Sequence, residues 1–380
     1  MLKSFFGRLF GRREKERRPV MRPTDIKKKQ ATGQSVAASE CREKTLGWLL
    51  NNCQQPVPPP AYDLNEPPEI SKEVRDHLYS RIKQIPAMPE IWHQVQEILQ
   101  QAGSSASDLG QCIAQDPVLT AQILKVCNSP AYSAMGNAEV VNLPLAIARL
   151  GLDETSSIVF RSVAPELGNS EKSKQEIRHI WFHIQAIALL SRILSESSHR
   201  LDRHEATQVA MLHDIGKLVI LHLEPEHKLE RLTHLINQDT SLLAAEYEVL
   251  GYTHVDAGKM LAQRWGLSEH VQNSIAFSHH LTASKINSLP KKMHHSMATL
   301  HIAHLVLNHA IDAQGQPNRQ TVWQNHLRTS LREDIADFAQ HGMHILLNTE
   351  GLYAQLLAEV ERLKLSFPDL FQPEEERGGA

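Results

Sequence analysis

A histidine and an aspartate stand side by side in the apolar segment QVAMLHDIGKLVILHL, residues 208–223. The imidazole of His213 and the carboxylate of Asp214 are donor types that borderline divalent metals bind. Lys217 follows Asp214 at i,i+3, where a helix brings its ammonium group to the carboxylate. The chain contains 22 histidines, so we asked whether this pair forms part of a metal centre.

Helices must position this pair, because helix signals recur along the chain. Asp116 before Pro117, and Asn142 before Pro144, are typical of helix starts, and Gly151 is typical of a helix end. No segment shows the alternation of a strand between hairpin turns. We therefore predict an all-α fold. Further helices are expected over about 174–198, 204–222, 241–250, 254–265, 268–281 and 293–312, with two amphipathic stretches within 320–365.

Charge is unevenly distributed along the chain. Residues 1–30 hold eleven Lys or Arg against three acidic residues, about +8, so the remainder is near −11 for a total of −3. An acidic body gives no electrostatic reason to expect nucleic-acid binding. Residues 1–18 combine an apolar cluster with basic residues, which is consistent with peripheral membrane contact. We favour the alternative, a disordered basic tail and Pro-rich linker over residues 1–70.

Cysteine usage and hydropathy indicate a cytoplasmic protein. The four cysteines have no CxxC spacing and resemble reduced thiols, and we expect Cys112 and Cys127 to be buried in helices. No apolar run reaches the roughly 18 residues that a membrane span needs. The tryptophans are scattered, as packing residues are, and no nucleophile motif of a hydrolase occurs.

Several motifs together resemble the HDOD domain, a bacterial signalling module related to HD phosphohydrolases. They are IPAMPEIWHQVQEIL, IAQDPVLTAQILKVCNSPAYS, VVNLPLAIARLGLDE, IWFHIQAIALLS, AMLHDIGKLVIL and the segment from AAEYEVLGYTH to SHH. The resemblance implies two packed helical bundles, the second shaped like an HD domain. We place the first bundle at 71–172, the second at 173–312, and a helical extension with a charged tail at 313–380.

The resemblance also implies a set of metal ligands. HD hydrolases hold a divalent metal with a histidine, a His-Asp pair and a later aspartate, which match His183, His213 and Asp214. At the fourth position this chain has His304 instead of aspartate, which removes a negative charge and a bridging oxygen.

A second set of ligands occurs in the two-metal, cyclic-dinucleotide-cleaving relatives called HD-GYP. His254, His279 and His280 match it, but SHHLTASKINSLP replaces the substrate-facing part of the motif. Lys217 matches a position at which hydrolases of this type can hold a phosphate. His254 is expected to be half-exposed, and His279 and His280 to close a helix as cationic rings. His301 and His309 are expected at the surface.

Two functions remain open at this point. The first, which we favour, is a non-catalytic regulatory protein that binds a protein partner or a small ligand such as a nucleotide, its His-Asp residues surviving as a buried polar network. The second is a metal-dependent phosphohydrolase or cyclic-nucleotide phosphodiesterase. Metal binding without turnover lies between them. We assign no catalytic residue, and the favoured function requires no cofactor. The alternative is that a divalent ion, Fe, Mn, Zn or Mg, binds at His213–Asp214.

Overall fold

The computed structural model describes residues 68–133, 139–164, 173–198, 200–236, 240–282, 284–312, 333–345 and 350–365, together with residues 238, 331, 367 and 370. Every regular element in these ranges is helical, as expected for an all-α fold. The predicted membrane-contacting segment and Pro-rich linker lie outside the described residues. None of the described helices is long and apolar enough to cross a membrane.

The first bundle is small and contains short helices. They are α4 (Glu90–Gln100), α5 (Ala106–Ile113), α6 (Pro117–Cys127), α7 (Pro130–Ser133), α8 (Leu143–Leu150) and α9 (Leu152–Val163). The predicted caps are confirmed. The carboxylate of Asp116 accepts from the N–H groups of Val118 and Leu119, and the Asn142 side chain accepts from Leu145. Cys112 and Cys127 are buried in this bundle, as expected.

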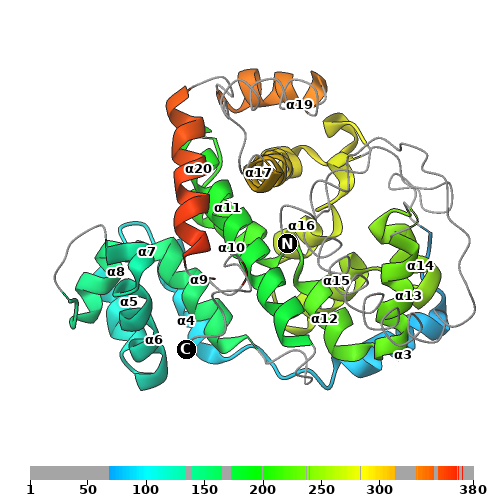
Figure 1. The fold of residues 1–380 in the computed structure, drawn as a ribbon, viewed down its shortest axis with the longest axis horizontal. Coiled ribbons are helices and arrows are strands. Elements are labelled where there is room, and N and C mark those ends of the chain that lie inside the picture. The colour runs from blue at the N-terminus through cyan, green and yellow to red at the C-terminus, as the bar shows by residue number, and fades with distance from the viewer. Residues whose placement is uncertain are drawn as a thin grey trace, which may run out of the picture.

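The second bundle surrounds the long helix α10 (Ser173–Ser198) (Figure 1). It continues through α11 (Arg203–Leu212), α12 (Ile215–Leu223), α13 (Glu226–Ile236), α14 (Leu242–Leu250), α15 (His254–Arg264), α16 (Glu269–Ala276), the 3-10 turns η1 (His280–Thr282), η2 (Ile286–Ser288) and η3 (Lys291–Met293), and α17 (His294–Asp312). The prediction of one helix over 204–222 was wrong, because the chain turns at His213 and Asp214. Helix α13 was missed, and α16 ends before its predicted end at 281.

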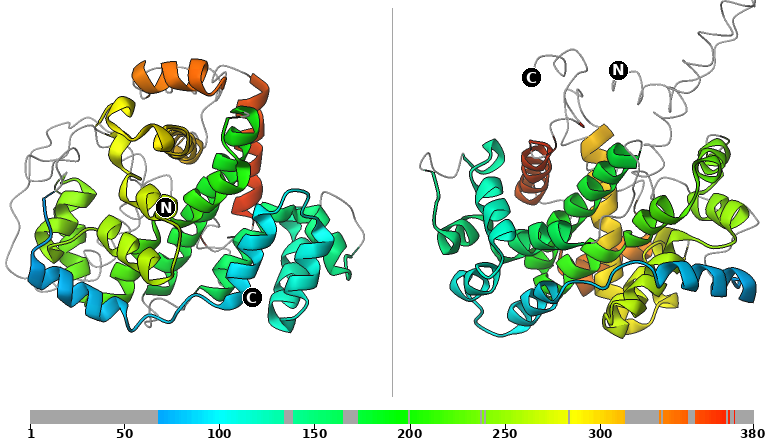
Figure 2. Two further views of the ribbon diagram at one scale, coloured as in Figure 1. Left: turned by 180° about the vertical axis from the view of Figure 1, so that it is seen from behind. Right: turned by 90° about the horizontal axis from the view of Figure 1, so that it is seen from below.

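A lead helix joins the two bundles from outside. Helix α3 (Lys72–Ile82) lies along the second bundle, and the chain then crosses to α4 in the first (Figure 2). Arg81 holds α3 in place, because its guanidinium lies 2.6 Å from the buried carboxylate of Glu224. Tyr252 donates to the same oxygen at 2.9 Å, just before α15 begins. This lead helix therefore belongs to the second bundle in space, although it precedes the first in sequence.

The C-terminal segment packs against both bundles. It contains α19 (Glu333–Asp337), the π-turn η4 (Phe338–Gly342) and α20 (Glu350–Lys364). Helix α20 contacts α10 and α17 of the second bundle and α7 of the first. Phe367 packs edge-on against Phe182 of α10, with ring centroids 5.5 Å apart. One continuous hydrophobic core runs through all these parts.

Candidate metal centre

The His-Asp pair occupies the break between two helices. His213 caps the end of α11, and Asp214 precedes α12 with φ −110° and ψ 12°. Neither side chain is exposed to solvent. The break directs both side chains into the interior of the second bundle, toward α10 and α17, which a single continuous helix would not do with adjacent residues.

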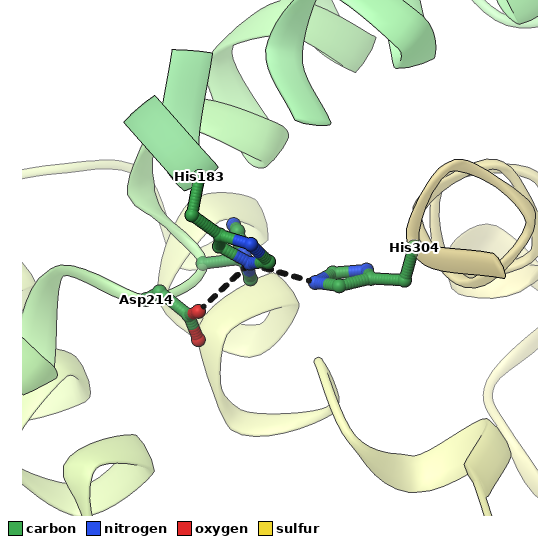
Figure 3. Close-up of side chains that lie close together, drawn as sticks. His183, Asp214 and His304 are labelled. Atoms are coloured by element: carbon green, nitrogen blue, oxygen red, sulfur yellow. Dashed lines mark hydrogen bonds and ion pairs between the residues drawn. The ribbon is translucent and has the colours of Figure 1, made fainter. Parts of the chain in front are cut away.

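Four of the predicted ligands meet in one place. The Nε2 atom of His183 lies 3.3 Å from the Oδ2 atom of Asp214 and 3.2 Å from the Nε2 atom of His304. The Nε2 atom of His213 lies 3.1 Å from both that carboxylate oxygen and the Nε2 atom of His304. His183 from α10 and His304 from α17 point toward each other and toward Asp214 (Figure 3). We call these four residues the first subsite.

Backbone carbonyls orient two of the rings. The Nδ1–H group of His213 donates to the carbonyl of Ala210 at 2.6 Å, and the Nδ1–H group of His304 donates to the carbonyl of Leu300 at 2.8 Å. A neutral imidazole has one N–H group and one lone pair, so each Nε2 atom presents a lone pair to the subsite. This arrangement is the one that metal-binding histidines adopt.

The first subsite fits a divalent metal ion. Metal–ligand bonds of about 2.0–2.1 Å in a tetrahedron place neighbouring donors about 3.3 Å apart. Four of the six donor–donor distances are 3.1–3.3 Å, close to this spacing, and all four donor atoms lie within 4.8 Å of one another. Three imidazole nitrogens and one carboxylate oxygen suit borderline ions such as Zn²⁺ and Fe²⁺ better than Mg²⁺. His304 therefore occupies the place expected of a ligand, despite its departure from aspartate.

A second group of donors shares Asp214, and we call it the second subsite. The Oδ1 atom of Asp214 lies 3.5 Å from the Nε2 atom of His254 and 3.7 Å from that of His279. The two histidine Nε2 atoms are 2.8 Å apart. His254 was expected to be half-exposed, but it is fully buried. The reason is that α15 begins against α12, where the backbones approach at Gly216 and Gly258.

A glutamate that the sequence analysis did not single out orients His254. The carboxylate of Glu246 lies 2.8 and 3.0 Å from the Nδ1 atom of His254 and accepts from its backbone N–H at 2.9 Å. Glu246 is fully buried on α14. The available signal was its position: Glu246 directly follows the apolar run LLAA at the start of α14 and lies eight residues before His254.

Lys217 interacts with the shared carboxylate. Its Nζ atom lies 2.7 Å from the Oδ2 atom of Asp214, and the side chain is fully buried. The i,i+3 pair expected from the sequence is therefore present. Burial by itself would raise the pKa of Asp214, but His213 and Lys217 lower it well below its usual range. Asp214 is consequently ionised at neutral pH and can serve both subsites.

Burial lowers the pKa of three of these histidines, His183, His279 and His304. Burial lowers the pKa of His183 to about 4 and that of His279 to about 3. Burial, followed by the neighbouring His213 and His183, lowers the pKa of His304 well below its usual value. The expectation of a cationic His279 at a helix end was therefore wrong. The prediction that His301 is exposed was also wrong, since only 7% of it is accessible; the side chain of His309 lies outside the described part.

His280 lies apart from both subsites. Its Nε2 atom is 2.7 Å from the hydroxyl of Ser288, and its ring packs edge-on against Phe277. In the described residues it joins neither group of convergent donors. Its role as a ligand stays a prediction, and the structure instead places it at the half-exposed start of η1.

Comparison with protein families identifies the family of this chain. The sequence profile of the HDOD domain matches residues 85–281, more than half of the chain. His304 lies beyond the matched range, so the fourth donor of the first subsite comes from a helix outside that profile. An uncharacterized protein of Treponema pallidum (strain Nichols) is 26% identical over 208 residues. That match covers 54% of this chain and 39% of the relative, about two fifths of its length.

Two solved structures share the fold. An HDOD domain protein with unknown function from Geobacter sulfurreducens aligns with TM-score 0.53 and 20% identity, covering 77% of this chain and 97% of that one. A protein from Shewanella amazonensis, whose name assigns it provisionally to the phosphohydrolases, aligns with TM-score 0.54 and 20% identity, covering 76% and 97%. At these identities the likeness concerns the helical fold alone.

Proposed function

Since the chain belongs to the HDOD domain family, we propose that it is a regulatory signalling protein whose buried His-Asp centre binds a divalent metal without turnover. It acts by binding a protein partner or a small ligand. The cytoplasm remains the proposed location, because the buried free thiols Cys112 and Cys127 suit a reducing compartment. This proposal corresponds to the intermediate case from the sequence, metal binding without catalysis.

Burial of the donors is the observation that carries this proposal. Of the six donor residues, His279 is the most accessible, at 5%, and His213, Asp214 and His254 have no accessible surface. Lys217, the candidate phosphate-binding residue, is fully buried as well. A phosphoester could reach these groups only if helices separated. Catalysis requires the reacting group of the substrate to lie within contact distance of the catalytic side chain.

A bound divalent ion can polarise a phosphoryl oxygen and activate water when a coordination position is open. In the first subsite, side chains of the protein would fill the coordination positions of the ion. His183, His213, Asp214 and His304 would supply four donors to a bound ion, which is the number of protein ligands in a structural zinc site. An ion held in this way links α10, the α11–α12 break and α17, so it would stabilise the second bundle as structural metals do.

A cavity of about 230 Å³ between the two bundles supports binding of a partner or small ligand. Ala106, Ile147 and Gly151 line it from the first bundle, and Arg192 and Arg203 line it from the second. Asp153 lies at the same place, and its carboxylate is 2.6 Å from the Nδ1 atom of His204 on α11. Occupation of this cavity would therefore affect the contact between the bundles, which suits a regulatory protein.

The alternative function is a metal-dependent phosphohydrolase. One observation favours it: each oxygen of Asp214 faces a different group of donors, as a carboxylate does when it bridges two metal ions. The second subsite has only three donors, which would leave a coordination position open. The burial of all donors weighs against this alternative in the structure as it stands.

One experiment separates the two functions. The full chain is purified, its metal content is determined by elemental analysis, and hydrolysis of bis(p-nitrophenyl) phosphate and of cyclic dinucleotides is measured with added Mn²⁺ or Fe²⁺. We expect bound metal and no turnover. Hydrolysis that disappears in His213→Ala would overturn the proposal in favour of the hydrolase. Correctly folded protein that takes up no metal would refute the metal centre.

A further inference from the structure

We infer that the cavity between the two bundles binds a small organic anion, a phosphate monoester or a carboxylate attached to a short apolar body. The charged group of this ligand takes the place that the carboxylate of Glu196 holds between Arg192 and Arg203. The inference rests on the regulatory function proposed above and gives the small ligand of that function a chemical class.

Two arginine side chains meet where the second bundle lines this cavity. The Nη1 atom of Arg192 on α10 lies 3.0 Å from the Oε1 atom of Glu196, and the Nη1 atom of Arg203, at the start of α11, lies 3.7 Å from the same oxygen. Both arginines line the cavity. A guanidinium group presents a planar set of donors that matches the oxygens of a carboxylate or a phosphate. Two such groups around one oxygen therefore form a site for an oxyanion.

Glu196 is a replaceable occupant of this site. Its side chain is 36% exposed, and those of Arg192 and Arg203 are 25% and 47% exposed. Ion pairs at such positions contribute little stability, because water screens the charges and the long side chains lose rotamer freedom. The carboxylate of Glu196 can therefore turn to solvent when the charged group of a ligand, which the cavity wall also holds, enters between the arginines.

The acidic residues of the cavity wall already have partners. The Oδ1 atom of Asp153 lies 2.6 Å from the Nδ1 atom of His204, and its Oδ2 atom lies 3.8 Å from the Nε atom of Arg203. Glu154 interacts electrostatically with Arg161 on the same helix, α9. These negative charges are balanced within the protein, so the guanidinium groups at the cavity remain able to attract an anion.

The first bundle supplies the apolar part of the wall. Ile147 and Leu150 on α8, Leu152 on α9 and Ala106 on α5 line the cavity. Its volume of about 230 Å³ is smaller than the roughly 300–1,000 Å³ of sites for drug-sized ligands. A cavity of about 150 Å³ is enough for benzene. The space therefore suits one apolar ring or short chain together with an oxyanion.

The test measures binding of three probes to the full-length protein, as purified and again after chelation of metal. The probes are phenyl phosphate, benzoate and inorganic phosphate, and isothermal titration calorimetry gives their affinities. We expect phenyl phosphate or benzoate to bind more tightly than inorganic phosphate, because only these two also fill the apolar part of the cavity. The tighter of the two shows whether the charged group is a phosphate or a carboxylate.

Four variants locate the binding. Arg192→Gln and Arg203→Gln should each weaken binding of the tighter probe by about 10-fold or more, because each removes a charge-assisted hydrogen bond. Glu196→Gln should strengthen it by up to about 5-fold, since the carboxylate that competes with the ligand is gone. Ala148→Phe, at an exposed position that lines the cavity, should abolish the preference over inorganic phosphate. Circular dichroism and thermal melting verify that each variant folds.

Arg231→Gln is the matched control. Arg231 on α13 is 64% exposed, and its guanidinium lies 3.7 Å from the carboxylate of Glu248 on α14. Neither residue lines the cavity, so this substitution removes an arginine from a surface ion pair of the same kind and should leave the affinity for every probe unchanged.

Three results would overturn the inference. The first is no binding of phenyl phosphate or benzoate at millimolar concentration, and the second is equal weakening in the Arg231 variant. The third is binding that persists in the Arg192 and Arg203 variants but disappears after chelation, which would place the anion at the metal centre. Protein that holds metal without turnover but binds no probe would refute only the anion site, whereas turnover in protein that binds the probe through the arginines would refute only the non-catalytic function.

Discussion

Replacing Gly216 by alanine should separate the two helices that carry the second subsite. An ideal Cβ atom on Gly216 would lie 1.8 Å from the carbonyl oxygen of His254 and 2.7 Å from the amide nitrogen of Gly258. Ordinary contacts begin at about 3.4 Å, so the start of α15 would have to retreat by about 1.5 Å. Both neighbours are backbone atoms, and no side-chain rotation can relieve the overlap.

The energetic cost can be estimated from this overlap. Overpacking a core usually costs about 1–3 kcal/mol and sometimes more. Because the overlap is with rigid backbone, we expect Gly216→Ala to lower the free energy of unfolding by about 3 kcal/mol or more. Gly258→Ala should cost less, since its Cβ would lie 3.1 Å from its nearest neighbours. Gly351→Ala is the control: its Cβ would meet nothing within 4 Å, and alanine is the better helix former by about 1 kcal/mol.

Urea unfolding followed by circular dichroism measures these effects, with all four proteins in the same chelator-containing buffer. The expected order of stability is Gly351→Ala, wild type, Gly258→Ala and Gly216→Ala. A Gly216→Ala protein within about 1 kcal/mol of the wild type would show that the helices do not approach in this way. The position of His254 beside Asp214 would then need another explanation.

Three further predictions concern other parts of the chain. Phe367→Ala should lower the free energy of unfolding by about 3–5 kcal/mol, because the ring packs against α10 and is only 3% exposed. The control is Leu365→Ala at a 55% exposed position, which should cost about 0.5 kcal/mol or less. Equal urea midpoints for the two variants would contradict this prediction. The hydrogen bond with Asp153 raises the pKa of His204, so its stabilisation is complete below the unfolded pKa of about 6.5 and is lost as pH rises through the folded pKa. His204→Gln should therefore destabilise the protein more at about pH 5.5 than at about pH 8.5, and a pH-independent difference would refute the pairing. Deleting residues 1–30 should leave membrane fractionation unchanged if they are only a basic tail; a loss of membrane-bound protein would support the anchor instead.

Much of the fold was predictable because it depends on local chemistry. The side chains of Asp116 and Asn142 cap helices a few residues away, and each cap is visible in the sequence. The break at His213 was not predicted, because QVAMLHDIGKLVIL has unbroken apolar periodicity. The break places His213 against His304 of α17, which lies 91 residues further along the chain, and no local pattern shows that contact.

The convergence of the site was only partly predictable. Family resemblance indicated His183 and His304, which lie 121 residues apart and meet at 3.2 Å. It did not indicate Glu246, because the resemblance concerned donors and not the groups that orient them. The expectation that His254 is half-exposed came from its place in the first turn of a helix, and it was wrong because burial there depends on how α15 packs on α12.

The sequence by itself determined that this protein is helical, that it belongs among HDOD proteins, and that it carries imidazoles and one carboxylate suited to a metal. Only the tertiary structure decided which nitrogen of each ring faces inward, and that every donor residue is buried. The physical reason is that residue type and local hydrogen bonding set helix ends within a few positions. Ring orientation and burial, in contrast, depend on contacts between helices that packing alone brings together.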